Sequence, residues 1–262
     1  MKTTIISMCT IACLLLVQQA EAQIKIRNAT KATGAVTNAA KAATFSDEDA
    51  ASLAKEAVDW MDEHNPVAEG DDPYAARLRK LTQGLESEDG LSLNFKVYKV
   101  IDVNAFACAD GSIRIFSSLM DMMDDDELLG IIGHEIGHIK NKDTRDAIRQ
   151  AYTRAAIGDA AAATSNEAAT LSDTELGKLA DEILGAKYSR KQEDEADKYA
   201  YEFLKRHGHD VMGLISTFNK FTEMAGDEER RKMSRMLSSH PDSKDRAAAI
   251  EKMAKADGLY KE

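Results

Sequence analysis

The sequence predicts an α+β domain that is mostly helical and carries one small sheet. Helical periodicity and capping signals recur along most of residues 46–262, whereas alternation rich in Val, Ile, Tyr and Phe is confined to residues 91–116. The chain has 262 residues, of which 44% are hydrophobic, and this is enough for one domain with a sizeable core. We therefore expect one folded domain, residues 46–262, preceded by a leader and a tether.

The first 22 residues have the pattern of a secretory signal peptide. Lys2 is followed by an apolar run from Ile5 to Val17 and then by Ala20-Glu21-Ala22, an A-x-A cleavage site. Lipidation at Cys13 is an alternative, although the apolar run continues past that cysteine. We expect the chain to be exported to the periplasm. Association with the outer membrane and secretion are the alternative locations.

Cysteine content, net charge and the composition after the signal narrow the class of protein. Removing the signal leaves Cys108 as the single cysteine, so we expect no intrachain disulfide and a small buried hydrophobe at this position. The formal net charge is −11 and no basic run is present, which argues against nucleic acid as a partner. Residues 23–45, rich in Ala, Thr and Asn, are predicted to form a flexible tether.

Two helices at the start of the domain are marked by their first residues. Ser46 with Asp49 three residues later is the pattern of a capping box, and it precedes "AASLAKEAVDWMDEH". Asp72 followed by Pro73 places a proline at the first position of a second helix, "YAARLRKLTQGL".

The helical pattern stops between residues 91 and 116. "LSLNFKVYKVI" alternates and is rich in β-formers, and "SIRIF" follows a turn at Asp110-Gly111, so we expect two or three strands. From Leu119 onward the chain returns to helix. Periodicity predicts helices at residues 124–142, 145–162, 173–207, 211–225 and 242–256.

His134, Glu135 and His138 stand within an apolar helical pattern, "ELLGIIGHEIGHIK". Histidines four residues apart leave the same helix face, so both imidazoles can bind one tetrahedral Zn²⁺. Glu135 is rotated off the metal and can reach the water at the open coordination position, where it acts as general base. The alternative is a pair of core histidines whose hydrogen bonds go to the backbone. This alternative is weaker because an acidic motif that can supply a third ligand follows later in the sequence.

A hydrolytic zinc site needs a third protein ligand, and "SRKQEDEADKYA" supplies the candidates. Glu193 and Asp197 are four residues apart on a predicted helix, so Glu193 can bind the metal while Asp197 accepts a hydrogen bond from the outer nitrogen of a ligand histidine. Glu195 is turned to another side. Taken alone, this acidic helix would be a solvated face. Beside the histidine pair, it predicts one Zn²⁺ per chain.

Together these motifs resemble metallopeptidase family forty-eight, the gluzincins that include the CAAX prenyl protease and soluble bacterial envelope proteases. The likeness covers residues 74–258 and rests on HEIGH, S-R-x-x-E-x-E-A-D, "SSHPDSKDR" and "VNAFACADGSIRIFSSLM". It implies a zincin-like fold whose edge strand lies above the HExxH helix, and a zinc endopeptidase with the ligands and base named above. The membrane-embedded branches of the family have long apolar helices between HExxH and the third ligand, whereas here this interval is Ala-rich and charged. The resemblance is therefore to the small periplasmic branch.

The resemblance also implies a substrate strand. In zincin clefts an extended peptide pairs with an edge strand above the metal helix, so the backbone of Asn104, Ala105, Phe106 and Ala107 would hold substrate by β-addition. An ordinary buried strand is the alternative for the individual side chains.

Two further residues come from "SSHPDSKDR". In related envelope proteases the matching histidine lies near the metal, so His240 is expected either to bind zinc in a latent form or to donate to the oxyanion in the active form. Arg246 is expected to anchor this segment through an acidic partner.

The resulting expectation is a zinc endopeptidase that cleaves unfolded or extended polypeptides, misfolded proteins of the bacterial cell envelope in particular. The alternative is a zinc-containing chaperone or assembly factor for envelope proteins, whose proteolysis is weak or latent. Envelope proteins are the candidate partners under both readings.

Overall fold

The computed structural model describes residues 45–158, 171–223, 231–241 and 243–261. The chain divides into two units, and residues 46–152 with 168–262 form the unit that contains the features discussed below. The other unit is residues 1–45 and 153–167. The predicted signal peptide, residues 1–22, and the predicted tether up to residue 44 lie outside the described residues.

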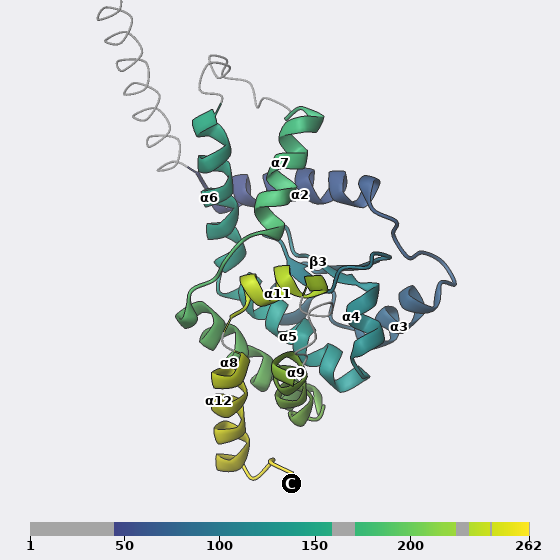
Figure 1. Ribbon diagram of the computed structural model, residues 1–262, viewed down its shortest axis with the longest axis vertical. Coiled ribbons are helices and arrows are strands. Elements are labelled where there is room, and N and C mark those ends of the chain that lie inside the picture. Colours follow the sequence, from purple (N-terminus) through teal and green to yellow (C-terminus); the bar gives the residue numbers. More distant parts are fainter. Residues whose placement is uncertain (1–44, 159–170, 224–230, 242, 262) are drawn as a thin grey trace, which may run out of the picture. The chain divides into compact units, whose positions relative to one another are not determined.

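The elements confirm a mostly helical α+β fold with a small sheet (Figure 1). Before the sheet come α2 (Asp47–His64), α3 (Pro73–Leu81) and the 3₁₀ turn η1 (Glu88–Gly90). The strands are β1 (Asn94–Tyr98), β2 (Ala105–Ala107) and β3 (Ser112–Phe116). The later helices are α4 (Ser117–Met122), α5 (Asp125–Lys140), α6 (Asp143–Gly158), α7 (Asp173–Leu184), α8 (Arg190–His207), α9 (Met212–Glu223), α11 (Ser234–Ser239) and α12 (Ser243–Ala256).

The predicted helix starts are confirmed. The Asp49 amide donates to Ser46 Oγ at 3.1 Å, and the Ser46 amide donates to the Asp49 carboxylate at 2.8 Å, which completes the capping box of α2. Asp72 accepts from the Tyr74 amide at 3.0 Å, with Pro73 as the first residue of α3. Local side-chain chemistry therefore determines where these two helices begin.

The prediction of one helix over residues 173–207 is wrong. Gly185 ends α7 after Leu184, and α8 starts at Arg190 behind a capping box in which Ser189 and Gln192 bond reciprocally. The periodicity continues through the break, so it hid a helix end and a new N-cap. The connection between the two helices brings Tyr188 to the site described below.

The sheet has the order β1-β3-β2, in which β1 is parallel and β2 antiparallel to β3. Asn104 C=O accepts from the Phe116 amide at 3.0 Å, and the Cys108 amide donates to Ser112 C=O at 2.8 Å. Because hydrogen-bonded pairs alternate along an antiparallel ladder, the backbone groups of Ala105 and Ala107 face the free edge. This edge strand contacts α5, as the resemblance implied.

Helix α5 is the centre of the domain. Every residue from Glu127 to Ile139 is buried, and the helix packs most extensively on α8 and then on α9. A Cβ at Gly137 would lie 3.0 Å from both Cα and C=O of Ala196 in α8, so the glycine permits a close approach of the two helices. That approach brings the carboxylates of α8 to the histidines of α5.

We expect Gly137→Ala to lower the free energy of unfolding by about 1–3 kcal/mol through overpacking, even though alanine is the better helix former by up to about 1 kcal/mol. Urea unfolding of the metal-free protein measures the effect. Gly130→Ala is the matched control in the same helix. Its Cβ would stand 3.3 Å from Leu214 Cα and Cδ1, a wider approach than the 3.0 Å at Gly137, so we expect a smaller loss. Equal stability of Gly137→Ala and the unaltered protein would contradict the packing argument.

None of the helices in the described part of the chain combines the length and the hydropathy that a membrane-spanning segment needs.

Candidate metal centre

Four side chains that can bind a metal meet between α5, α8 and the end of α11. They are His134, His138, Glu193 and His240, all buried, and one ligand atom from each lies within 4.8 Å of the others. His134 Nε2 and His138 Nε2 are 3.0 Å apart. The Glu193 carboxylate oxygens lie 3.6 Å from His134 Nε2 and 3.5 Å from His138 Nε2. The structure thus brings together the three predicted ligands, and His240 with them.

The donor set fits a zinc ion. Donors bound at about 2.0–2.1 Å around a tetrahedral centre stand roughly 3.3–3.4 Å from one another, close to the separations of the two histidines and Glu193. The outer nitrogens are already engaged, since His134 Nδ1 lies 2.8 Å from Asp197 and His138 Nδ1 lies 2.9 Å from Asp143. With the protons on Nδ1, the two Nε2 lone pairs face each other, an arrangement that a shared cation stabilises.

Asp143 was missed in the sequence analysis. It follows α5 across a turn in which Lys142 has φ +66°, and it accepts from Gln192 Nε2 at 2.9 Å as well as contacting His138. Its only signal was an acidic residue five positions after the second histidine. That signal becomes useful only once the turn is known to fold the chain back onto the motif.

The structure identifies the acidic partners of Arg246. The guanidinium donates to both oxygens of Asp197, at 2.7 and 2.6 Å, and its third nitrogen lies 2.7 Å from Glu193. Burial raises the pKa of Asp197, but hydrogen bonds from Arg246 and His134 outweigh it and hold that pKa below its usual value. Arg246 therefore pairs with two buried carboxylates and keeps the pKa of Asp197 low.

The two histidines of α5 differ in their electrostatics. Burial lowers the pKa of His134, and the charge of Arg246 lowers it further. Burial also acts to lower the pKa of His138, but hydrogen bonds with Asp143 and Glu193 outweigh it and raise that pKa to about 9. A metal ion bound at Nε2 would therefore compete with a proton for His138.

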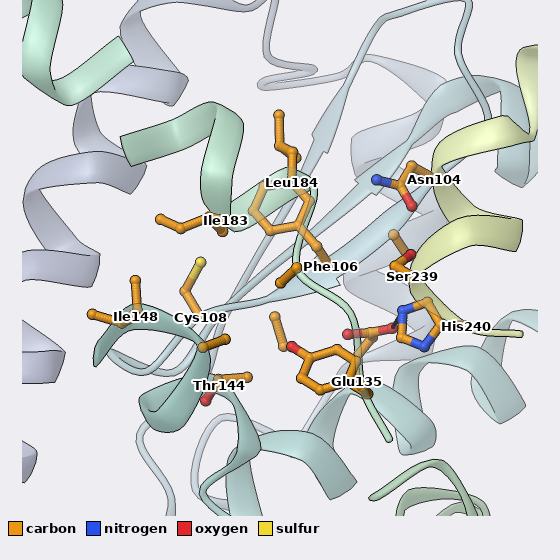
Figure 2. A pocket seen from close by; sticks show the side chains of 15 residues that line it. Asn104, Phe106, Cys108, Glu135, Thr144, Ile148, Ile183, Leu184, Ser239 and His240 are labelled. Carbon is orange, nitrogen blue, oxygen red and sulfur yellow. Dashed lines mark ion pairs between the residues drawn. The ribbon is translucent and has the colours of Figure 1, made fainter. Parts of the chain in front are cut away.

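Glu135 and His240 lie next to the metal ligands, and Figure 2 shows these two side chains side by side. Glu135 is 2% exposed, and its Oε1 lies 3.8 Å from His240 Nε2. The other ring nitrogen of His240, Nδ1, lies 3.0 Å from Glu193 and 3.2 Å from His134 Nε2. His240 thus bridges the metal ligands and Glu135. The Tyr188 ring stacks on His138 with a centroid distance of 3.9 Å.

The predicted substrate strand lies beside the same group. Asn104, Ala105, Phe106 and Ala107 line a pocket that also includes Glu135 and His240. All four residues are buried.

Comparison with known proteins agrees with this geometry. The model of peptidase family M48 matches residues 75–254. Metalloprotease YcaL of Escherichia coli (strain K12) is 40% identical over 214 residues, 81% of this chain and 83% of the relative. Metalloprotease LoiP of the same strain is 36% identical over 220 residues, 84% of this chain and 86% of the relative. A protease HtpX homolog of Salinibacter ruber is 27% identical over 184 residues, 58% of this chain and 64% of the relative.

A match over most of the chain, two related metalloproteases and a buried cluster of zinc-binding side chains together show that this chain is a zinc metalloprotease of peptidase family M48.

Proposed function

We propose that the chain is an endopeptidase that cleaves unfolded or extended polypeptides, including misfolded proteins, in the bacterial cell envelope. The observation that carries the proposal is the position of Glu135, which lies 3.8 Å from His240 of the metal-binding cluster and lines one pocket with the edge strand β2. The secretory pattern of residues 1–22 supports an envelope location. An extended chain is the form of substrate that can pair with a strand edge.

We assign the ligands as His134, His138 and Glu193, in keeping with the separations of their donor atoms. Zinc held there supplies Lewis acidity that activates water and polarises a carbonyl. Asp197 and Asp143 orient the two imidazoles through their Nδ1 atoms, and Arg246 fixes Asp197 in turn.

Glu135 carries the proton in this scheme. Its buried carboxylate takes a proton from the attacking water and passes it to the amine that leaves. Ala105 and Ala107 direct their backbone groups away from β3. Once this buried edge is opened to substrate, those groups would position the scissile bond by main-chain hydrogen bonds and leave the substrate side chains to nearby pockets.

Unfolded casein tests the proposal. We expect the protein that starts at Gln23 to cleave casein, a chelator to abolish cleavage, and added zinc to restore it. The burial of the edge strand and of all four cluster residues also suits the alternative, a chaperone with latent proteolysis. Suppression of casein aggregation without any cleavage, at any zinc concentration, would favour that alternative and contradict the endopeptidase.

The role of His240 determines whether this conformation is latent. Its Nδ1 lies 3.2 Å from His134 Nε2 and 3.0 Å from Glu193, so His240 would be a fourth protein ligand of an ion held there, and four protein ligands would leave no position for water. We therefore expect His240→Ala to raise basal cleavage of casein several-fold, measured as the initial rate at saturating zinc. A lowered rate would instead assign His240 to the oxyanion, and an unchanged rate would discard both roles.

A further inference from the structure

The start of α8 surrounds the imidazole of His138. Tyr188, two residues before the helix, stacks on this ring, and a Glu193 carboxylate oxygen lies 3.5 Å from its Nε2. Gln192 reaches the same ring through a third residue. Its Nε2 donates to Asp143 Oδ1 at 2.9 Å, and Asp143 Oδ2 lies 2.9 Å from His138 Nδ1. Gln192 is therefore in a position to act on His138 through Asp143.

The partners of the Gln192 side chain determine which way its amide points. Oε1 accepts from the Ser189 amide at 2.9 Å and from the Ser189 hydroxyl at 2.8 Å. A backbone N–H can only donate and a carboxylate can only accept, so Oε1 must face Ser189 and Nε2 must face Asp143. The capping box that starts α8 thus holds one end of this side chain, and the other end holds Asp143.

Asp143 depends on this contact because of its place in the chain. It follows the reversal at Lys142, where φ is +66°, and it is 5% exposed. Among the residues that the structure describes, Gln192 supplies the one side-chain hydrogen bond to its Oδ1. Without that donor, a buried oxygen is left unpaired and the carboxylate can rotate away from His138.

We propose that Gln192 is a positioning residue for the zinc ligand His138. By orienting Asp143, it keeps the imidazole proton on Nδ1 and the Nε2 lone pair directed at the metal. The capping box thereby links the start of the helix that carries Glu193 to the orientation of a ligand on α5. The proposal rests on the ligand assignment made with the proposed function, and it does not depend on which substrate is cleaved.

The zinc affinity of Gln192→Met tests the proposal. Methionine keeps the length of the side chain but neither donates to Asp143 nor accepts from Ser189. We expect the Kd for zinc, measured by competition with a chelator of known affinity, to rise about 10-fold. This is the lower end of the range for groups that orient a ligand, because Gln192 is one residue further from the metal than Asp143.

Ser189→Ala is the matched control for a role in the helix cap alone. It removes the cap hydroxyl, but the Ser189 backbone amide still donates to Gln192 Oε1 and the Gln192 amide still faces Asp143. Both variants should unfold at lower urea in the presence of a chelator, since each weakens the capping box. The Kd for zinc should rise only in Gln192→Met. An equal rise in Ser189→Ala would reduce Gln192 to a capping residue and overturn the proposal.

A double-mutant cycle tests whether Gln192 acts through Asp143. Asp143→Ala is expected to raise the Kd for zinc by up to about 100-fold. Once Asp143 is absent, adding Gln192→Met should have no further effect on the Kd. A further 10-fold rise in that background would show that Gln192 acts by another route and would contradict the proposal.

The outcomes also separate this inference from the proposed function. An unchanged Kd in Gln192→Met, with casein still cleaved by the unaltered protein, would overturn the role of Gln192 alone. A raised Kd in Gln192→Met, with no cleavage of casein by the unaltered, zinc-loaded protein, would support the role of Gln192 and overturn the endopeptidase.

Discussion

The Glu135→Gln protein is expected to fold, to bind zinc, and to cleave unfolded casein about 10²- to 10⁴-fold more slowly than the unaltered chain, the usual contribution of a general acid–base group. The substitution keeps the shape of the side chain but removes the proton acceptor. Glu135 is not a member of the group of four that can hold the metal, so zinc content should stay the same. Initial rates on casein, metal content and urea unfolding measure the three parts of this expectation.

Glu195→Gln is the matched control. Glu195 is exposed on α8 and lies 3.7 Å from Lys191, an ion pair of the surface type that contributes little. This variant should cleave casein at the unaltered rate. If Glu135→Gln also cleaves at that rate while holding zinc, Glu135 is not the base and another group must take the proton.

Local signals in the sequence were sufficient for the helix starts and for the helix that carries the two histidines. Capping boxes depend on side chains three residues apart, so Ser46 with Asp49 can be identified without the fold. The spacing of His134 and His138 determines that both rings leave one face of α5. Glu193 and Asp197 follow the same rule on α8, and the structure brings both to the histidines.

Contacts that depend on the tertiary fold could not be predicted from the sequence in the same way. Asp143 reaches His138 because the chain reverses at Lys142, and Arg246 reaches Asp197 because α12 packs beside α8. The six-residue helix α11, which ends next to His240, is too short to leave a periodic signal. Hydrophobic periodicity likewise concealed the break between Leu184 and Arg190, because apolar spacing reports a buried face and not the continuity of a helix.

Arg246→Met is expected to lower the free energy of unfolding of the metal-free protein by about 3–5 kcal/mol, the loss that follows when one partner of a buried ion pair is removed. The arginine is 5% exposed and contacts both Asp197 and Glu193, so its removal leaves two buried carboxylates without their cation. Methionine keeps an apolar stem over the Phe218 ring, where Arg246 Cζ lies 4.3 Å from the centroid. Urea unfolding in the presence of a chelator measures the loss.

Two comparisons test whether the loss comes from the buried ion pairs: the zinc-loaded protein and a variant at a surface arginine. Bound zinc returns positive charge to Glu193, so the same substitution should destabilise the zinc-loaded protein less than the metal-free one. Arg235→Met is the control, because Arg235 is 48% exposed and lies 4.0 Å from Asp181, and a surface pair of this kind contributes about 0–1 kcal/mol. A loss below about 1 kcal/mol for metal-free Arg246→Met would mean that protonation or water, and not the guanidinium, stabilises the buried carboxylates.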